Sequence, residues 1–237
     1  MITLAFDTCL DKMYVVLKKD GKISASKIIE NHDNKYHSAF LISTLQEVLS
    51  ENSIKPNDID LIGVNIGPGS FTGIRACVTV ARVMAQQLNC KTVGVSSLEI
   101  LAKAEDQRSG CQEGRLFNDS NLSETLQKQQ TDNSYTSIPL YIQTSLVALD
   151  ARKNCAYLFH DGEIKGAVDL EKVKEVIATG KYNVITDDKL QPILGGKSYQ
   201  KENLPLGEIL AKLAEEKVSD GDWHKLKPLY IQPPPMG

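Results

Sequence analysis

The sequence predicts an α/β protein made of two halves, the second shorter than the first. Strand and helix patterns over residues 1–104 follow the order strand, strand, strand, helix, strand, helix. A reduced set of similar patterns occupies residues 138–237. Between them, residues 105–137 are rich in Gln, Ser, Asn and Asp. This composition predicts a surface insertion loop, within which a short helix at 122–129 is an option, because too little apolar area is available to offset the ordering entropy.

The first half opens with three predicted antiparallel strands. Apolar strand patterns at 2–7 and 13–17 are followed by Asp20-Gly21, a dipeptide typical of hairpin turns. From His37 to Leu49, apolar residues recur at the i, i+3, i+4, i+7 spacing of a helix that lies on a sheet. The expected helix therefore begins near His37.

The chain is centred on residues 61–75, LIGVNIGPGSFTGIR, which predict a buried strand, a glycine turn and the start of a helix over 72–88. Ser70 and Thr72 are both expected to be able to cap this helix. The helix amino end, with Arg75 in its first turns, is a plausible seat for an anion or a partner's carboxylate. The glycine spacing matches neither a dinucleotide fingerprint nor a P-loop nor a nucleophile elbow. A structural turn and a binding loop both remain open.

The second half repeats short strand and helix patterns. Strands are expected within 138–149, 155–159, 163–168 and 182–186, and helices over 170–177 and 206–217. The tail from Pro228 is too rich in proline to continue as a helix.

The charge, the apolar content and the cysteines of the sequence limit the classes of function that are expected. The formal net charge is −3 and the pI about 5.9, which disfavours a stand-alone nucleic-acid binder. No apolar run approaches the length of a membrane span, so a soluble, cytoplasmic protein without membrane attachment is expected. The five cysteines are scattered without a C-x-x-C pair, and Cys77 and Cys155 lie in apolar patterns. We expect buried, unreactive thiols at these two positions.

Five blocks of the sequence resemble the TsaB (YeaZ) family of proteins needed for the threonylcarbamoyladenosine modification of tRNA. The blocks are LAFDTC (4–9), GPGSFTGIR (67–75), VGVSSLEILA (93–102), LVALDARKNCAYL (146–158) and PLYIQ (228–232). The resemblance implies the actin-like ATPase fold of sugar kinases, heat-shock chaperones and actin, with two lobes and a reduced second lobe. The polar segment 105–137 departs from the family, which crosses this point with a shorter link.

The resemblance also bears on catalysis. The catalytic relatives, the TsaD proteins, bind a metal through an H-x-x-x-H pair on the first helix, and here the position four after His37 is Leu41. The turns after Asp7 and Asp150 lack the glycines that close on nucleotide phosphates, so both carboxylates are expected to bond their own turns and not Mg²⁺. No serine or cysteine comes with an evident base. We therefore expect no catalytic residue, no cofactor and no metal.

The helix over 72–88 carries a second apolar line, Ala76, Val80 and Val83, beside its core stripe. Either the second domain or another helix covers this line, or it is a subunit interface. The predicted interface residues are His37, Gly69, Phe71, Arg75, Ala76, Val80 and Val83.

The resemblance implies a non-catalytic scaffold and activator that binds TsaD as a heterodimer. TsaE joins in an ATP-dependent complex, tRNA is contacted only through the complex, and a homodimer is a further assembly. TsaD transfers threonylcarbamoyl to N6 of adenosine 37 in tRNAs that read codons starting with A. The alternative is an ATP-dependent small-molecule kinase or a hydrolase of the same fold, including a glycoprotease-like enzyme or ATPase. A direct tRNA-binding module is disfavoured by the acidic balance.

Overall fold

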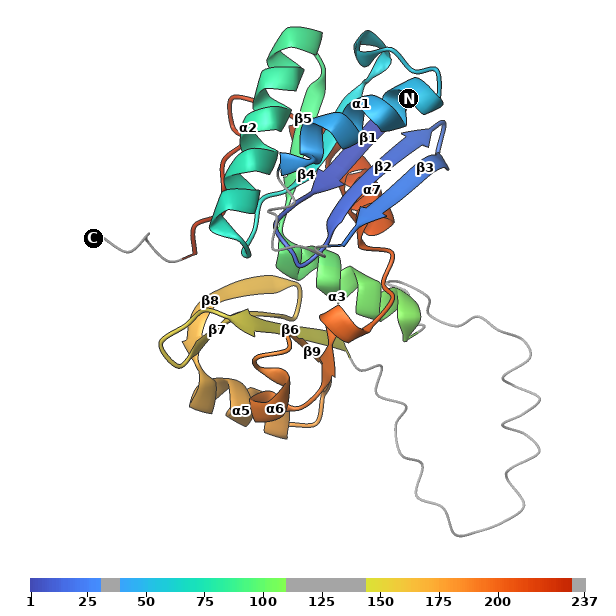
Figure 1. Ribbon diagram of the computed structural model, residues 1–237. Helices are drawn as coiled ribbons and strands as arrows, with labels where there is room; N and C mark the ends of the chain where they lie inside the picture. The colour runs from blue at the N-terminus through green and yellow to red at the C-terminus, as the bar shows by residue number, and fades with distance from the viewer. Residues whose placement is uncertain (31–38, 110–143, 232–237) are drawn as a thin grey trace, which may run out of the picture.

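The computed structural model describes residues 1–30, 39–109 and 144–231. Two five-stranded mixed sheets form two lobes, and a helix, α3 (Ser97–Arg108), lies at their junction (Figure 1). The strand orders are β3-β2-β1-β4-β5 and β8-β7-β6-β9-β10, so the second lobe repeats the topology of the first. Among the described helices, none is long and apolar enough to cross a membrane.

The first sheet joins an antiparallel meander to two parallel strands. Its strands are β1 (Ile2–Asp7), β2 (Met13–Lys19), β3 (Lys22–Ile29), β4 (Leu61–Asn65) and β5 (Lys91–Val95). The first three are antiparallel neighbours, whereas β4 lies parallel to both β1 and β5. The predicted hairpin is confirmed, since Asp20 and Gly21 take φ values of 49° and 79° between β2 and β3.

Two helices, α1 (Leu41–Glu51) and α2 (Phe71–Leu88), cover one face of the first sheet (Figure 1). Their apolar sides pack against residues of β1 and β4 such as Phe6 and Ile62. The described helix begins at Leu41, later than the expected start, and His37 itself lies outside the described residues. Residues 39 and 40 are exposed and only Leu41 enters the core, so packing supports the helix from Leu41 onward.

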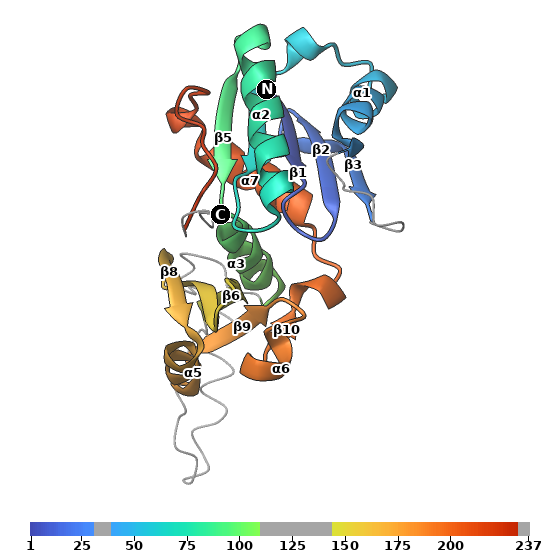
Figure 2. The same ribbon diagram turned by 60° about the vertical axis from the view of Figure 1, so that its left-hand side comes forward.

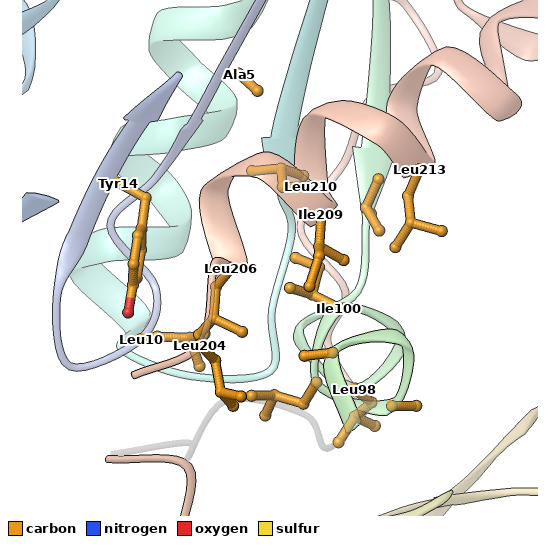
Figure 3. Close-up of a cluster of buried hydrophobic side chains, with 14 of the residues drawn as sticks. Ala5, Leu10, Tyr14, Leu98, Ile100, Leu204, Leu206, Ile209, Leu210 and Leu213 are labelled. Carbon is orange, nitrogen blue, oxygen red and sulfur yellow. The ribbon is translucent and has the colours of Figure 1, made fainter. Parts of the chain in front are cut away.

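The opposite face of the first sheet is covered by α7 (Leu206–Glu216), a helix from the second half of the chain. In Figure 3, Leu206, Ile209 and Leu210 point into a cluster with Ala5 and Tyr14. At Gly63 of β4 an added Cβ would lie 2.6 Å from the Cβ of Ala214, so the helix and the strand are in close contact. Grouping 206–217 with the second lobe is therefore corrected, because its apolar face completes the first lobe.

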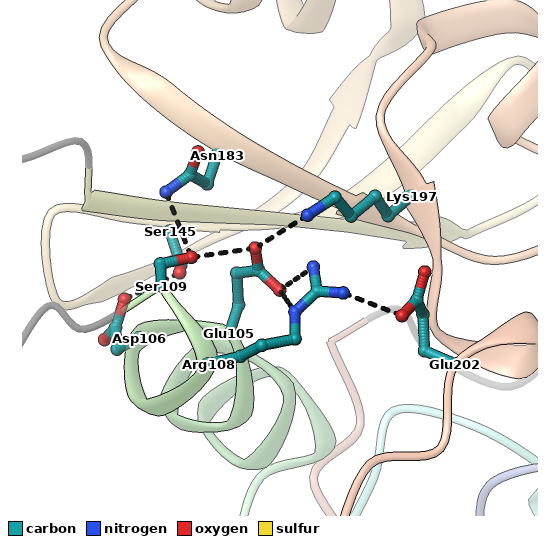
Figure 4. Close-up of polar contacts among 8 residues, drawn as sticks. All are labelled: Glu105, Asp106, Arg108, Ser109, Ser145, Asn183, Lys197 and Glu202. Atoms are coloured by element: carbon teal, nitrogen blue, oxygen red, sulfur yellow. Dashed lines mark hydrogen bonds and ion pairs between the residues drawn. The ribbon is translucent and has the colours of Figure 1, made fainter.

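The expected boundary between residues 104 and 105 falls inside α3. Glu105 is 1% exposed, and its carboxylate accepts bonds from Arg108 Nε (2.8 Å) and Ser109 Oγ (3.0 Å) (Figure 4). Arg108 also donates to Glu202 Oε2 at 2.7 Å. These contacts extend the helix past the predicted start of the insertion. The remainder of that insertion, with the helix considered at 122–129, lies outside the described residues.

The second lobe is smaller, as predicted. Its strands are β6 (Thr144–Asp150), β7 (Cys155–His160), β8 (Glu163–Asp169), β9 (Tyr182–Thr186) and β10 (Lys197–Ser198). On one face, α5 (Leu170–Ala178) and the short α6 (Gln191–Leu194) pack against Leu146 and Leu158. On the other face α3 separates the sheet from the first lobe (Figures 1 and 2).

Candidate functional site

The glycine-rich turn joins β4 to α2, and Ser70 caps the helix as predicted. Its hydroxyl accepts a 3.2 Å bond from the backbone N–H of Gly73. The Gly67-Pro68 peptide bond is cis. The turn lies directly beside the residues that follow β1, Thr8 and Cys9, which belong to the first strand's own turn.

The glycines of this turn lie in close contact with the backbone of residues that follow β1. An added Cβ at Gly73 would lie 1.8 Å from the carbonyl oxygen of Thr8, and one at Gly69 would lie 2.4 Å from that of Cys9. The N–H of Ser70 donates to the Cys9 carbonyl (2.8 Å), and the hydroxyl of Thr8 donates to the Gly73 carbonyl (2.8 Å). Of the two interpretations left open by the sequence, this geometry fits the structural turn. The N–H of Ser70 and that of Gly73 are both already bonded within the chain.

A buried polar network ties the ends of three strands together below this turn. Asn65 donates from Nδ2 to Asp7 (2.9 Å), and its Oδ1 accepts from the Ser97 hydroxyl (2.9 Å) and the Gly67 N–H (2.8 Å). Asp7 also accepts from the N–H of Cys9 at 2.6 Å. Burial raises the pKa of Asp7, and these hydrogen bonds act in the opposite direction. Asp7 thus bonds its own turn, as the sequence predicts.

Sequence reasoning did not single out Asn65 and Ser97. Asn65 is the buried polar last residue of β4, and Ser97 is a buried polar residue two positions after the end of β5; these positions were the available signal. Such residues lie at the carboxyl edge of a parallel sheet, where polar side chains from neighbouring strands meet.

Asp7, Cys9 and Cys77 bring a carboxylate oxygen and two sulfur atoms within 4.8 Å of one another. Metal coordination requires deprotonated thiolates. The pKa of Cys9 is held well above its usual range by burial and by its contacts with Cys77 and Asp7, and its thiol donates to the Asn65 carbonyl at 3.2 Å. The Cys9 thiol and the Asp7 carboxylate are thus both engaged in hydrogen bonds within the chain. Cys77 is buried as expected, whereas Cys155 is half-buried.

Asp150, the counterpart of Asp7 in the second lobe, bonds its own turn as well. It accepts from the Arg152 N–H (2.8 Å) and from Lys189 Nζ (2.9 Å). Partial burial raises the pKa of Asp150, but the bonds from Lys189 and Arg152 outweigh this effect and lower it. Arg152 and Lys153 form this turn with φ values of 63° and 49°.

The second apolar line belongs to α2, a helix on the outer side of the first lobe, and the second lobe lies beyond α3 (Figures 1 and 2). Ala76 and Val80 are half-buried, whereas Val83 is 55% exposed. Phe71, at the first turn of α2, is 49% exposed, and the Arg75 guanidinium lies 4.9 Å above its ring. Val80 is the one member of the line that also packs against the first lobe's core.

Of the other predicted interface residues, Gly69 is in contact with Cys9 through its backbone position. His37 lies outside the described residues. The prediction that Leu41 replaces the second histidine of a metal-binding pair can therefore be compared with the structure only at Leu41. Leu41 is 1% exposed and serves the core of the first lobe.

Two lobes of repeated topology, a helix between them and altered nucleotide turns define a two-lobed protein of the actin-like ATPase fold. The family model for TsaD, tRNA N6-adenosine threonylcarbamoyltransferase, matches residues 26–112. Two solved structures of Pseudomonas aeruginosa proteins share the fold. One is described as a protein with similarity to peptidase YeaZ; it has a TM-score of 0.68 and 20% sequence identity, and the match covers 98% of this chain and 99% of the other. The second is named YeaZ; it has a TM-score of 0.62 and 19% identity, and the match covers 97% of this chain and 99% of the other.

The tRNA threonylcarbamoyladenosine biosynthesis protein TsaB of Bacillus subtilis is 27% identical over 235 residues, which cover 98% of this chain and 94% of the relative. The TsaB protein of Escherichia coli is 28% identical over 110 residues, 46% of each chain. Over nearly its whole length the chain is similar to this Bacillus subtilis protein, and the comparisons support the TsaB family. Human tRNA N6-adenosine threonylcarbamoyltransferase is 30% identical over 104 residues, 39% of this chain and 31% of the relative.

Proposed function

We propose that this chain is a non-catalytic subunit that binds TsaD and supports transfer of a threonylcarbamoyl group to N6 of adenosine 37 in tRNAs that read codons starting with A. TsaE joins the assembly in an ATP-dependent manner, and tRNA is bound through the complex. Relatives with the name of a threonylcarbamoyladenosine biosynthesis protein support the pathway. The role within the pathway rests on the surface of α2.

The observation that carries the proposal is the exposed apolar line on α2. Val83 is 55% exposed and Phe71 49% exposed, and the Phe71 ring lies beside that of Tyr230 with ring centroids 6.1 Å apart. Half-buried Ala76 and Val80 extend the same face toward the core. A continuous apolar face on a helix favours a protein partner, because its burial removes apolar surface from water. Arg75 over Phe71 adds a cation and an aromatic ring, residue types that are enriched at binding hot spots.

The partner we infer is a protein with an equivalent lobe. The TsaD model matches residues 26–112, which include α1, α2 and the strands between and beside them. Two related lobes can pair through corresponding helices with near-twofold symmetry, as identical chains do. The same face would serve a homodimer, so self-association and TsaD binding compete for it.

The turn geometry supports an accessory role. In an enzyme that uses a glycine turn for phosphate, the backbone N–H groups point to the ligand. Here the Ser70 N–H bonds the Cys9 carbonyl, and Asp7 bonds Cys9 and Asn65. The residues that relatives of this fold would use for nucleotide are engaged in internal bonds.

The test compares Val83→Glu with Ile193→Glu. Ile193 lies on α6 of the second lobe and is 50% exposed, so the two variants add the same charge at equally accessible apolar positions. With tagged TsaD from the same organism, we expect Val83→Glu to lose co-purification and threonylcarbamoyladenosine formation, while Ile193→Glu retains both. Retention of both by Val83→Glu would exclude α2 as the docking face.

A further inference from the structure

A cavity of about 230 Å³ lies at the free edge of the first sheet. There the segment after α7 runs beside β5 (Figure 2). Thr92 and Gly94 of β5 form one side. Ile66 and Leu226 supply apolar wall, and lysines from α7's end and the following segment complete the rim. None of these residues belongs to the α2 face or to the glycine turn.

The walls of this cavity are held in place by packing. Leu226 is 5% exposed and is part of the first lobe's core. An added Cβ at Gly94 would lie 2.6 Å from Ile66 and 2.9 Å from Leu226, so the segment rests directly on the strand. The N–H of Leu229 donates to the Ile66 carbonyl at 2.9 Å. A preformed cavity binds ligand without a large ordering cost.

Positive charge dominates the lining, although the whole chain carries a net charge of −3. The charged lining residues are Lys217, Lys225, Lys227 and Asp222. Lys217 is paired with Glu99 (2.6 Å). The Asp222 carboxylate accepts from the backbone N–H and the ring Nδ1 of His224, each at 2.9 Å.

Lys225 and Lys227 are exposed, and neither forms an ion pair with a carboxylate in the part of the chain that the structure describes. The charge of Lys225 helps to lower the pKa of Asp222, after the larger effect of the His224 bonds. Two lysine ammonium groups therefore remain available at the rim. Each offers three donors suited to the oxygens of a phosphate.

The interior of the cavity adds a second polar feature. Thr92 is 2% exposed, and its hydroxyl has no hydrogen-bond partner among the described residues. A buried hydroxyl without a hydrogen-bond partner lowers stability. After a small shift of the side chain, this hydroxyl could bond an oxygen of the ligand, or a water molecule bound with the ligand. Trp223, stacked on His224 with ring centroids 3.6 Å apart, stands next to the lining segment.

We infer that this cavity binds a small phosphorylated anion. Its phosphate oxygens bond Lys225 and Lys227, and a compact organic group contacts Ile66 and Leu226. The volume lies below the range of about 300–1,000 Å³ typical of drug-sized ligands, so phosphate, diphosphate or a small phosphate ester fits better than a larger molecule. The inference stands apart from TsaD binding.

Trp223 is the single tryptophan of the chain, so its fluorescence reports on this region in the full-length protein. We expect titration with inorganic pyrophosphate to give a saturable signal. The double variant Lys225→Glu/Lys227→Glu should weaken binding by roughly a hundredfold, since each charge-assisted contact contributes roughly a factor of ten. The control is Lys172→Glu/Lys174→Glu on α5 of the second lobe, which makes the same change in net charge and should leave binding intact.

Absence of saturable pyrophosphate binding in calorimetry would overturn the inference. So would equal binding of sulfate and pyrophosphate at matched ionic strength, or equal loss in the α5 control, because both indicate general charge attraction. A single-stranded RNA oligonucleotide forms a separate arm. Binding of RNA without binding of pyrophosphate would assign the lysines to an RNA surface and refute the small-ligand site. Circular dichroism checks that each variant is folded.

Discussion

The backbone N–H of Ser70 donates a 2.8 Å hydrogen bond to the carbonyl oxygen of Cys9. This bond joins the glycine turn before α2 to the turn after β1. It accounts for the glycines at 69 and 73, whose missing Cβ atoms leave space for the Cys9 and Thr8 carbonyls. The most recognisable segment of the sequence therefore serves first to fix α2 on the sheet.

Gly73→Ala should destabilise the protein. Alanine is favoured over glycine in a helix by about 1 kcal/mol, which alone would stabilise α2. The added Cβ would, however, lie 1.8 Å from the backbone oxygen of Thr8, and backbone cannot move aside cheaply. We expect a loss of about 3 kcal/mol or more in the free energy of unfolding, measured by urea denaturation. Thr72→Ala, at an exposed position of the same turn, is the control and should change it little; equal effects would contradict the steric account.

Val80→Glu and Val83→Glu should differ in stability. Val80 is half-buried against the first lobe's core, so a carboxylate there loses part of its hydration and should cost about 1–3 kcal/mol. Val83 is 55% exposed, and its replacement should stay within about 0.5 kcal/mol of the parent. Thermal unfolding followed by circular dichroism measures both. A large loss at Val83 would mean that this face is covered within the chain.

Glu105→Ala should lower the free energy of unfolding by about 1–3 kcal/mol, because it removes a buried carboxylate that accepts hydrogen bonds from Arg108 and Ser109. Glu202→Ala removes the half-exposed partner of the same Arg108 and should cost less than about 1 kcal/mol. Urea denaturation of both variants makes the comparison. Equal costs would show that the buried carboxylate contributes no more than the surface ion pair.

Asp150 gives a prediction for pH. Its pKa is lowered in the folded protein, so its ionised form contributes stability above the ordinary pKa of an aspartate, and that contribution is lost as pH falls through the lowered pKa. Asp150→Asn should therefore be slightly less stable than the parent at neutral pH, and the difference should vanish in strong acid. Unfolding curves at several pH values test the sign. A difference that grows on acidification would contradict it.

The strands and helices that depend on local sequence patterns were predicted close to their observed residue ranges. Apolar alternation and turn residues gave β1, the β2–β3 hairpin, α2 with its Ser70 cap, α5 and β9 close to their observed bounds. These features depend on neighbours within a few residues, which the sequence displays directly. The described α1 begins later than expected, because burial begins only at Leu41.

Local pattern alone predicts a helix with one apolar face over residues 206–217, and glycines at 69 and 73 that permit a close approach. That this helix packs on the first sheet, against Ala5 and Tyr14, and that Thr8 and Cys9 make the close approach, follows from contacts that only the folded chain shows. The same holds for the bonds of Asn65 to Asp7 and Ser97. An apolar stripe specifies that a surface must be buried, whereas the partner that buries it is chosen by contacts between segments distant in the chain.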